Sequence, residues 1–163
     1  MDSTHPTIDT LLTMFSDYLK NKKLRHTAER NAIFTKICQT TEPFTLEMIR
    51  QQLEDANFHV SRASVYNTIE LLLDANIVVR HQFTSTIVQY ELKYIAEQFN
   101  YAICTRCGTV RKIKNDKLKK VLSDYKTPKF TMEYHTVQFY GICSKCKFRI
   151  AQKEKQEHKK QNS

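Results

Sequence analysis

The sequence contains only two glycines, three prolines and no tryptophan among its 163 residues. Two glycines are too few for the glycine-rich loops that cradle phosphates in nucleotide-binding enzymes. No apolar run approaches the roughly 20 residues of a transmembrane helix, and polar residues interrupt the apolar ones near the N-terminus, unlike in a secretory signal peptide. We therefore expect a cytoplasmic protein with no membrane partner.

Basic residues, by contrast, are abundant. The chain has 26 Lys and Arg against 17 Asp and Glu, a formal net charge of +9 and an isoelectric point near 9.3. A charge of this sign and size favours a polyanionic partner such as nucleic acid. A basic, well-solvated surface explains the net charge equally well.

Four of the five cysteines form two pairs, Cys104-Thr105-Arg106-Cys107 and Cys143-Ser144-Lys145-Cys146, with 35 residues between them. Four thiolates suit the closed tetrahedral coordination of a structural Zn²⁺, which leaves no open position for catalysis. The alternatives are two disulfides or a redox dithiol. A zinc deaminase would require a proline before one pair, which neither has. We predict about one structural Zn²⁺ per protomer and no enzymatic activity or small-molecule substrate. The fifth cysteine, Cys38, lies in an apolar helical pattern and is predicted to be a small buried hydrophobe.

The first half of the chain has the periodicity of four helices. They are expected at residues 8–19, at 27–39, after a cap at Thr45, and at 62–74 after a cap at Ser61. Two β-rich runs at 77–83 and 87–92, joined by Thr84-Ser85-Thr86, predict a hairpin. Helices followed by a hairpin is the order of a winged helix-turn-helix, expected over residues 1–92.

The second half predicts a smaller α/β unit at residues 98–150, after a hinge at about 91–97. Short strands are expected at 101–103 and 110–113, a helix at 118–125, and a strand at 134–142 that ends at the second cysteine pair. A bound zinc would staple this small unit together. Residues 151–163 are predicted to be a charged tail, which could extend a helix from Phe148-Arg149-Ile150 but whose end is expected to be frayed and solvated. The fold class is therefore α+β.

The fourth helix carries the chemistry expected of a DNA reader. In a helix-turn-helix, the first turns of the second helix enter the major groove. Arg62 can reach phosphate or guanine, Ser64 can bond phosphate, and Tyr66 offers its ring to a thymine methyl group, with Asn67 beside them. An upstream basic run that includes Arg25 can follow the backbone or a minor groove, although a solvated face is the simpler interpretation of that run alone.

These features occur in the order seen in ferric uptake regulator (Fur) family repressors, which the chain resembles over about residues 8–148. The resemblance is carried by six segments: Thr27-Ala28-Glu29-Arg30, residues 61–69, residues 77–81, Tyr90-Glu91-Leu92, Ile103-Cys104 with Cys107-Gly108, and residues 139–143. It implies a C-terminal dimerisation domain and a cytoplasmic bacterial homodimer that binds palindromic, AT-rich duplex DNA. It also implies that Tyr66 contacts bases, that Arg25 enters the minor groove and that the segment starting at Thr27 belongs to the DNA-binding surface. Cys104, Cys107, Cys143 and Cys146 match the structural zinc ligands of the family.

The chain departs from the family at the positions that hold the sensed metal. Gln98-Phe99-Asn100-Tyr101 replaces a histidine-rich cluster, Phe44 replaces a histidine, and Arg111-Lys112 replaces an acidic ligand. Only Glu91 and His135 keep ligand-type side chains, and one carboxylate with one imidazole would hold a divalent cation weakly. A histidine such as His135, on an alternating strand, is more typical of packing or surface than of a ligand.

Three hypotheses follow. In the favoured one, zinc is purely structural and DNA binding needs no regulatory metal or uses another effector. In the second, an unconventional site is built from Glu91, His81, Asn100 and His135; haem is disfavoured because the chain has no Cys-Pro motif. The alternative from another class is a zinc-stabilised nucleic-acid or protein adaptor without operator specificity. An adaptor needs no helix-plus-hairpin reader, and its affinity for duplex DNA would depend little on salt.

Overall fold

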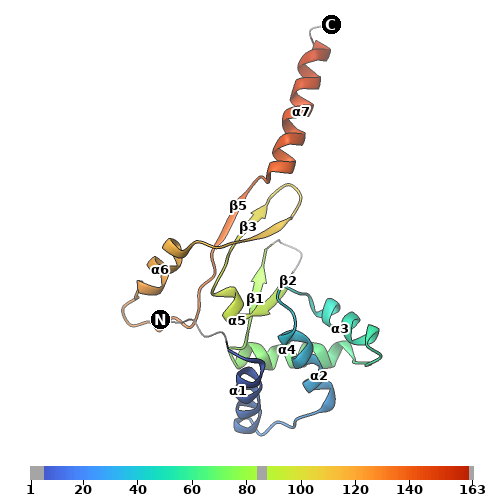
Figure 1. The fold of residues 1–163 in the computed structure, drawn as a ribbon, viewed down its shortest axis with the longest axis vertical. Coiled ribbons are helices and arrows are strands. Elements are labelled where there is room, and N and C mark those ends of the chain that lie inside the picture. The colour runs from blue at the N-terminus through green and yellow to red at the C-terminus, as the bar shows by residue number, and fades with distance from the viewer. Residues whose placement is uncertain (1–5, 84–87, 162–163) are drawn as a thin grey trace. The chain divides into compact units, whose positions relative to one another are not determined.

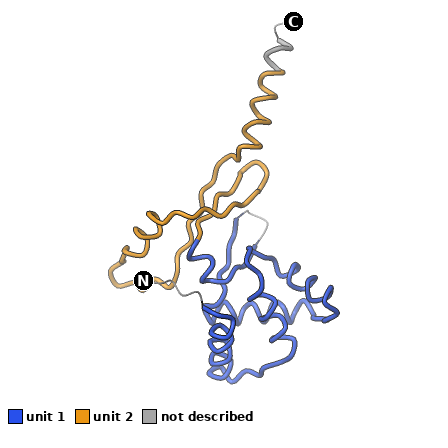
Figure 2. The backbone as a smooth tube through the Cα atoms, viewed as in Figure 1, with its two compact units in different colours: residues 1–98 blue, residues 99–163 orange. Residues whose placement is uncertain are grey.

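The computed structural model describes residues 6–83 and 88–161 and divides the chain into two compact units, Met1–Gln98 and Phe99–Ser163 (Figure 2). Each unit has its own sheet, two-stranded in the first and three-stranded in the second. No described helix combines the length and the apolar composition needed to cross a membrane.

Residues 1–98 form the helices and hairpin expected from the sequence. In chain order (Figure 1) the elements are α1 Ile8–Asn21, α2 Ala28–Cys38, α3 Leu46–Asp55, α4 Arg62–Asp74, β1 Val78–Gln82, β2 Val88–Leu92 and the short α5 Lys93–Ala96. Each of the four long helices starts at a hydroxyl side chain that accepts a hydrogen bond from a backbone N–H three residues later. These caps are Thr7, Thr27, Thr45 and Ser61. The predicted helices and the predicted caps at Thr45 and Ser61 are confirmed.

The core of this unit consists of apolar side chains at helical spacing. The rings of Phe15 from α1 and Phe34 from α2 stack with their centroids 5.2 Å apart, and both side chains are buried. The inner face of α4 is also fully buried, at Val65, Ile69 and Leu72. α2, α3 and α4 pack on one another, so the N-terminal end of α4 is held on a rigid three-helix base.

The hairpin β1–β2 is antiparallel, with Arg80 opposite Tyr90. Phe44, between α2 and α3, adds a third strand-like partner: its N–H donates to the Tyr90 carbonyl at 2.8 Å, and the Tyr90 N–H donates back at 2.7 Å. The hairpin is thus anchored to the helix-turn-helix by backbone bonds. The predicted turn Thr84-Ser85-Thr86 lies outside the described residues.

Residues 99–163 form a three-stranded sheet and two helices (Figure 1). The elements are β3 Asn100–Cys104, β4 Val110–Ile113, α6 Asp116–Asp124, β5 Gln138–Gly141 and α7 Ser144–Gln161. The strand order is β4-β3-β5, with β3 antiparallel to β4 and parallel to β5. The strands expected at 101–103 and 110–113 and the helix near 118–125 are confirmed.

The strand expected over residues 134–142 is shorter than predicted. Only Gln138–Gly141 forms β5, because its partner β3 is five residues long and their register starts at Tyr101 opposite Gln138. Just before β5, the Val137 carbonyl accepts a hydrogen bond from the Tyr101 N–H at 2.9 Å. Alternating apolar residues therefore continue past the point where a neighbouring strand is available to pair with them.

Of the two alternatives for the C-terminal segment, an extended helix and a frayed tail, the described residues form the helix. Helix α7 starts at Ser144, inside the second cysteine pair, and continues to Gln161. The segment has no glycine or proline and is rich in lysine, glutamate and glutamine, which are strong helix formers. The high charge suggested solvation, which is compatible with a helix.

Candidate nucleic-acid interface and metal centre

The N-terminal half of α4 presents polar side chains to solvent above its buried face. The Arg62 side chain is 82% exposed and Tyr66 is 53% exposed, and Asn67 is exposed as well. On the other side of the helix, Val65 is buried against the core. The structure thus brings three of the predicted DNA-binding residues onto one open surface at the start of α4.

Two glutamates from the neighbouring helices hold residues at this end of α4. The Ser64 hydroxyl donates to the Glu29 carboxylate of α2 at 2.5 Å. Glu47, in the first turn of α3, lies 3.6 Å from the Arg62 guanidinium. The hydrogen bond from Arg50, with smaller contributions from the charges of Arg50 and Arg62, lowers the pKa of Glu47. Sequence reasoning missed both glutamates; their signal was an acidic residue in the first turn of each preceding helix.

The remaining predicted DNA-binding residues lie around the start of α2. The Thr27 side chain caps α2 by accepting from the Arg30 N–H at 3.2 Å, and the Arg30 guanidinium donates to the Arg25 carbonyl. The Arg25 side chain is exposed. Thr27 therefore has a structural role that is independent of any role in binding DNA.

A buried histidine–glutamate pair lies within the hairpin. His81 Nε2 and Glu91 Oε2 are 3.1 Å apart, and neither side chain has any exposed surface. The imidazole of His81 stacks on Phe83, with ring centroids 4.8 Å apart. Glu91, predicted as a weak regulatory ligand, is thus bonded inside residues 1–98. Asn100 and the half-buried His135 belong to residues 99–163.

The four paired cysteines converge in residues 99–163. Their sulfur atoms all lie within 4.8 Å of one another, and no disulfide joins them. Cys107 Sγ and Cys143 Sγ are 3.8 Å apart, which is about the sulfur–sulfur edge of a tetrahedron with metal–sulfur bonds of about 2.3 Å. Among the described side chains, residues 6–83 and 88–156, this is the one group of three or more His, Cys, Asp or Glu ligand atoms close enough to hold a metal ion.

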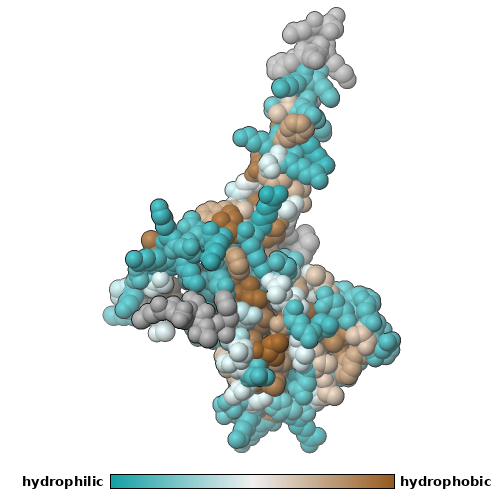
Figure 3. All heavy atoms as spheres, viewed as in Figure 1, coloured by the Kyte–Doolittle hydropathy of each residue, from teal (hydrophilic) through white to brown (hydrophobic). Residues whose placement is uncertain are grey.

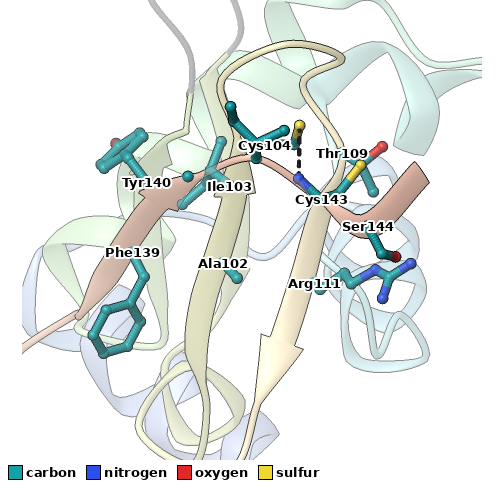
Figure 4. Close-up of a pocket in the computed structure, with 11 residues that line it drawn as sticks. Ala102, Ile103, Cys104, Thr109, Arg111, Phe139, Tyr140, Cys143 and Ser144 are labelled. Carbon is teal, nitrogen blue, oxygen red and sulfur yellow. Dashed lines mark hydrogen bonds between the residues drawn. The ribbon is translucent and has the colours of Figure 1, made fainter. Parts of the chain in front are cut away.

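The local backbone positions these sulfurs. Gly108 adopts φ +71° and its N–H donates to the Cys104 carbonyl at 2.8 Å, which closes the turn of the first pair. The Cys143 N–H donates to Cys104 Sγ at 3.3 Å (Figure 4). The second pair lies where β5 gives way to α7, and the parallel pairing of β5 with β3 brings it beside the first pair.

The pKa values of Cys104, Cys107 and Cys146 shift in different directions. The N–H of Cys143 is the main cause that lowers the pKa of Cys104 to about 6, and the Thr109 hydroxyl lowers the pKa of Cys107. The neighbouring sulfurs, Cys107 first, raise the pKa of Cys146 to about 12. These shifts favour some thiolates in the cluster but oppose four thiolates at once, because their negative charges repel one another. A bound cation would neutralise this repulsion. The isolated Cys38 differs: burial raises its pKa to about 12, as expected for the buried, inert thiol predicted from the sequence.

An open pocket of about 280 Å³ lies beside the cysteine cluster (Figure 4). Its lining combines apolar side chains such as Phe139 and Ile103 with Arg111 and the hydroxyls of Thr109 and Ser144. Arg111 is the residue that stands where the family has an acidic ligand, and its positive charge opposes cation binding there.

The fold and the two sites define a winged-helix protein with a second unit that carries a four-cysteine cluster. The sequence profile described as "Ferric uptake regulator family" matches residues 21–140. The chain is 27% identical over 141 residues to the "Ferric uptake regulation protein" of Campylobacter jejuni, covering 85% of this chain and 89% of that protein. It is 30% identical over 132 residues to the protein of the same name from Bordetella parapertussis, covering 78% and 93%.

More distant similarity extends to a peroxide regulator and to solved structures. The "Peroxide operon regulator" of Bacillus subtilis is 25% identical over 130 residues, covering 78% of this chain and 88% of that protein. The Helicobacter pylori ferric uptake regulator superposes with a TM-score of 0.67 at 17% identity, covering 90% of this chain and 97% of that one, and shows the shared fold. The chain belongs to the ferric uptake regulator family and is a transcriptional regulator of that family.

Proposed function

We propose that the protein is a homodimeric, sequence-specific regulator that reads palindromic duplex DNA with the N-terminal half of α4 and holds one structural Zn²⁺ per protomer. The observation that supports DNA reading most directly is the exposed surface of Arg62, Tyr66 and Asn67 over the buried face of α4. A reader helix needs both properties, because base contacts depend on side chains that a rigid base holds in position.

Dimerisation through residues 99–163 is supported by apolar surface that these residues leave uncovered. Strand β5 is at one edge of the sheet, so its outer backbone groups are available to another strand. Large apolar side chains of this unit are exposed, among them Phe139, Tyr140, Ile142, Phe130 and Val121. A second copy of the same surface would cover them, and a C₂ dimer places two α4 helices on the two halves of a palindrome.

Zinc is the metal that best fits the cysteine cluster. Thiolates in a tetrahedral S₄ arrangement select zinc or an iron–sulfur centre, and the closed geometry is that of structural zinc. The cluster joins β3, β4 and α7, which have little apolar core of their own. Cys104, Cys107, Cys143 and Cys146 would hold the ion, and its role is to stabilise the fold.

The regulatory metal site of the family is proposed to be lost or unconventional. The structure of the Helicobacter pylori relative is described as having three functional metal binding sites. In this chain Phe44 is fully buried under the hairpin, and the Glu91 carboxylate is bonded to His81. Elemental analysis after incubation with excess Fe²⁺, Mn²⁺ or Zn²⁺ and desalting should find one tightly held zinc per protomer. A second, exchangeable equivalent would contradict this proposal.

The DNA-reading proposal is tested by the double variant Arg62→Ala, Tyr66→Ala. Each base contact contributes about 1–3 kcal/mol, so Kd for a preferred palindromic duplex should rise by about 100-fold or more. Arg62→Lys with Tyr66→Phe keeps the charge and the ring and should recover part of the affinity. Both variants should remain dimers by light scattering. Unchanged Kd in the alanine variant would remove α4 from the interface.

The salt dependence of the affinity for duplex DNA distinguishes the proposed regulator from an adaptor without operator specificity. A regulator that neutralises phosphates loses affinity for duplex DNA steeply as salt rises, with a log–log slope of about −0.9 per phosphate contact. An adaptor would show a flat dependence and no preference among duplex sequences.

A further inference from the structure

The positive charge of the chain is concentrated in residues 99–163, the unit without the reader helix. This unit has 16 Lys and Arg against five Asp and Glu, a formal charge of +11, whereas residues 1–98 have 10 against 12, a charge of −2. Four thiolates around one Zn²⁺ would subtract about two charges and leave the second unit strongly basic. The net electrostatic attraction of the chain to a polyanion therefore comes mainly from residues 99–163, while residues such as Arg25 and Arg62 contribute locally.

Helix α7 presents part of this basic charge at regular spacing. Its described side chains, residues 144–156, include five exposed basic residues and a single acidic one, Glu154. At 100° per residue, Lys145, Arg149 and Lys153 fall on one face of the helix, with Gln156 between them and Gln152 at the edge of that face, and Glu154 lies on the opposite side. The three basic residues are spaced by about 6 Å along the helix axis.

This helix is not held in place by a core. α7 makes no extensive contact with any other described element, and most of its visible surface is hydrophilic (Figure 3). Phe148 is 64% exposed. An isolated helix of this kind is only marginally stable in water. A polyanion along its basic face would neutralise the repulsion among the lysines and stabilise it. The family profile ends at residue 140, before this helix begins.

We infer that α7 is a second DNA-contacting element, whose face of Lys145, Arg149 and Lys153 binds phosphates of the duplex. This inference rests on the proposed DNA-binding function and adds a role for the C-terminal unit. Phosphate contacts carry no sequence information, so α7 supplies affinity while α4 supplies specificity. Charge complementarity selects the occupant: three donors in a row, with no acidic residue on the same face among the described side chains of residues 144–156, suit a continuous row of phosphates.

The test uses the full-length, zinc-loaded protein and a short duplex of arbitrary sequence. Arg149→Gln with Lys153→Gln removes two contacts outside the cysteine pairs. The matched control, Lys117→Gln with Lys120→Gln, removes two exposed charges from α6. The slope of log Kd against log salt should fall in magnitude by about 1.8 for the α7 variant, at about 0.9 per phosphate contact, and remain unchanged for the control. Zinc content and light scattering check that the metal and the dimer persist.

The outcomes separate this inference from the proposed function. If both variants lose the same slope, the effect is one of net charge and α7 is not a contact. If neither changes while the wild-type slope stays steep, DNA binding stands and the role of α7 is overturned. If only the α7 variant alters the oligomeric state, α7 is an assembly surface instead. A flat wild-type slope would overturn the proposed function and this inference with it.

Discussion

The two units of this protein are stabilised in different ways. Among the described residues, 22 buried hydrophobic side chains lie in residues 1–98 and four lie in residues 99–163. Two of those four are Cys104 and Cys146, members of the metal cluster. The first unit can fold by burying apolar surface. The second has a small core, and the proposed metal ion and partner surface would supply the missing stability.

Removal of the metal should have the largest effect and should be confined to one unit. A structural zinc contributes on the order of 10–16 kcal/mol of apparent binding free energy in small domains. We expect Cys104→Ser, or chelation of the wild type, to abolish hydrogen-exchange protection in β3, β4 and β5 while α1 to α4 remain protected. Cys38→Ser, in the other unit, is the matched control and should retain the metal. Loss of protection in α1 to α4 after chelation would show that the two units fold as one.

A core deletion should have the converse effect. Phe34 is 1% exposed and stacks on Phe15, whereas Phe148 on α7 is 64% exposed. Phe34→Ala should lower the free energy of unfolding of the first unit by about 3–5 kcal/mol, with zinc content unchanged. Phe148→Ala, the same substitution on an open surface, should change stability by no more than about 0.5 kcal/mol. Denaturant unfolding followed by circular dichroism measures both. A large loss for Phe148→Ala would mean that α7 packs against a partner.

The helices of the first unit could be predicted because each carries both a cap and an apolar stripe. Thr45 and Ser61 mark where α3 and α4 begin, and Val65, Ile69 and Leu72 mark the buried face. The second unit was harder to predict because its elements are short and depend on partners distant in sequence. No sequence motif near either strand indicates the parallel pairing of β3 with β5. The length of β5 depends on how many residues of β3 can pair with it.

For the candidate sites, residue spacing predicted the ligands where a single short motif supplies them. Two Cys-x-x-Cys turns indicated the metal cluster directly, since each brings two sulfurs together locally. The pairing of Glu91 with His81 depends on the register of β1 and β2, which one residue of slippage would destroy. The Ser64–Glu29 bond depends on how α2 packs against α4. Sequence periodicity carries neither kind of information.

A substitution in the buried His81–Glu91 pair tests whether Glu91 stabilises the fold or binds a sensed metal. Glu91→Gln keeps the shape but weakens the bond to His81, so we expect a loss of about 1–3 kcal/mol in the unfolding free energy of the first unit. Glu97→Gln, which alters a peripheral pair with Lys93 at 4.0 Å, is the control and should change little. Metal stoichiometry and Kd for DNA, measured where both variants are folded, should match the wild type. A metal-dependent change in Kd for Glu91→Gln alone would restore Glu91 as a regulatory ligand.

The smallest expected effect comes from the helix caps of the first unit, where a contribution to stability can be distinguished from a contribution to DNA affinity. Thr7 and Thr27 cap α1 and α2 in the same way, each accepting a backbone N–H at 3.2 Å. Replacing either by Ala should cost about 1 kcal/mol of stability, and replacing either by Ser should cost less because the hydroxyl remains. Only Thr27 is predicted to belong to the DNA-binding surface. With both alanine variants fully folded, a higher Kd for Thr27→Ala than for Thr7→Ala isolates its contribution to DNA binding, because the capping loss is common to both. Equal Kd values would mean that Thr27 acts only as the cap that positions Arg25 and the start of α2.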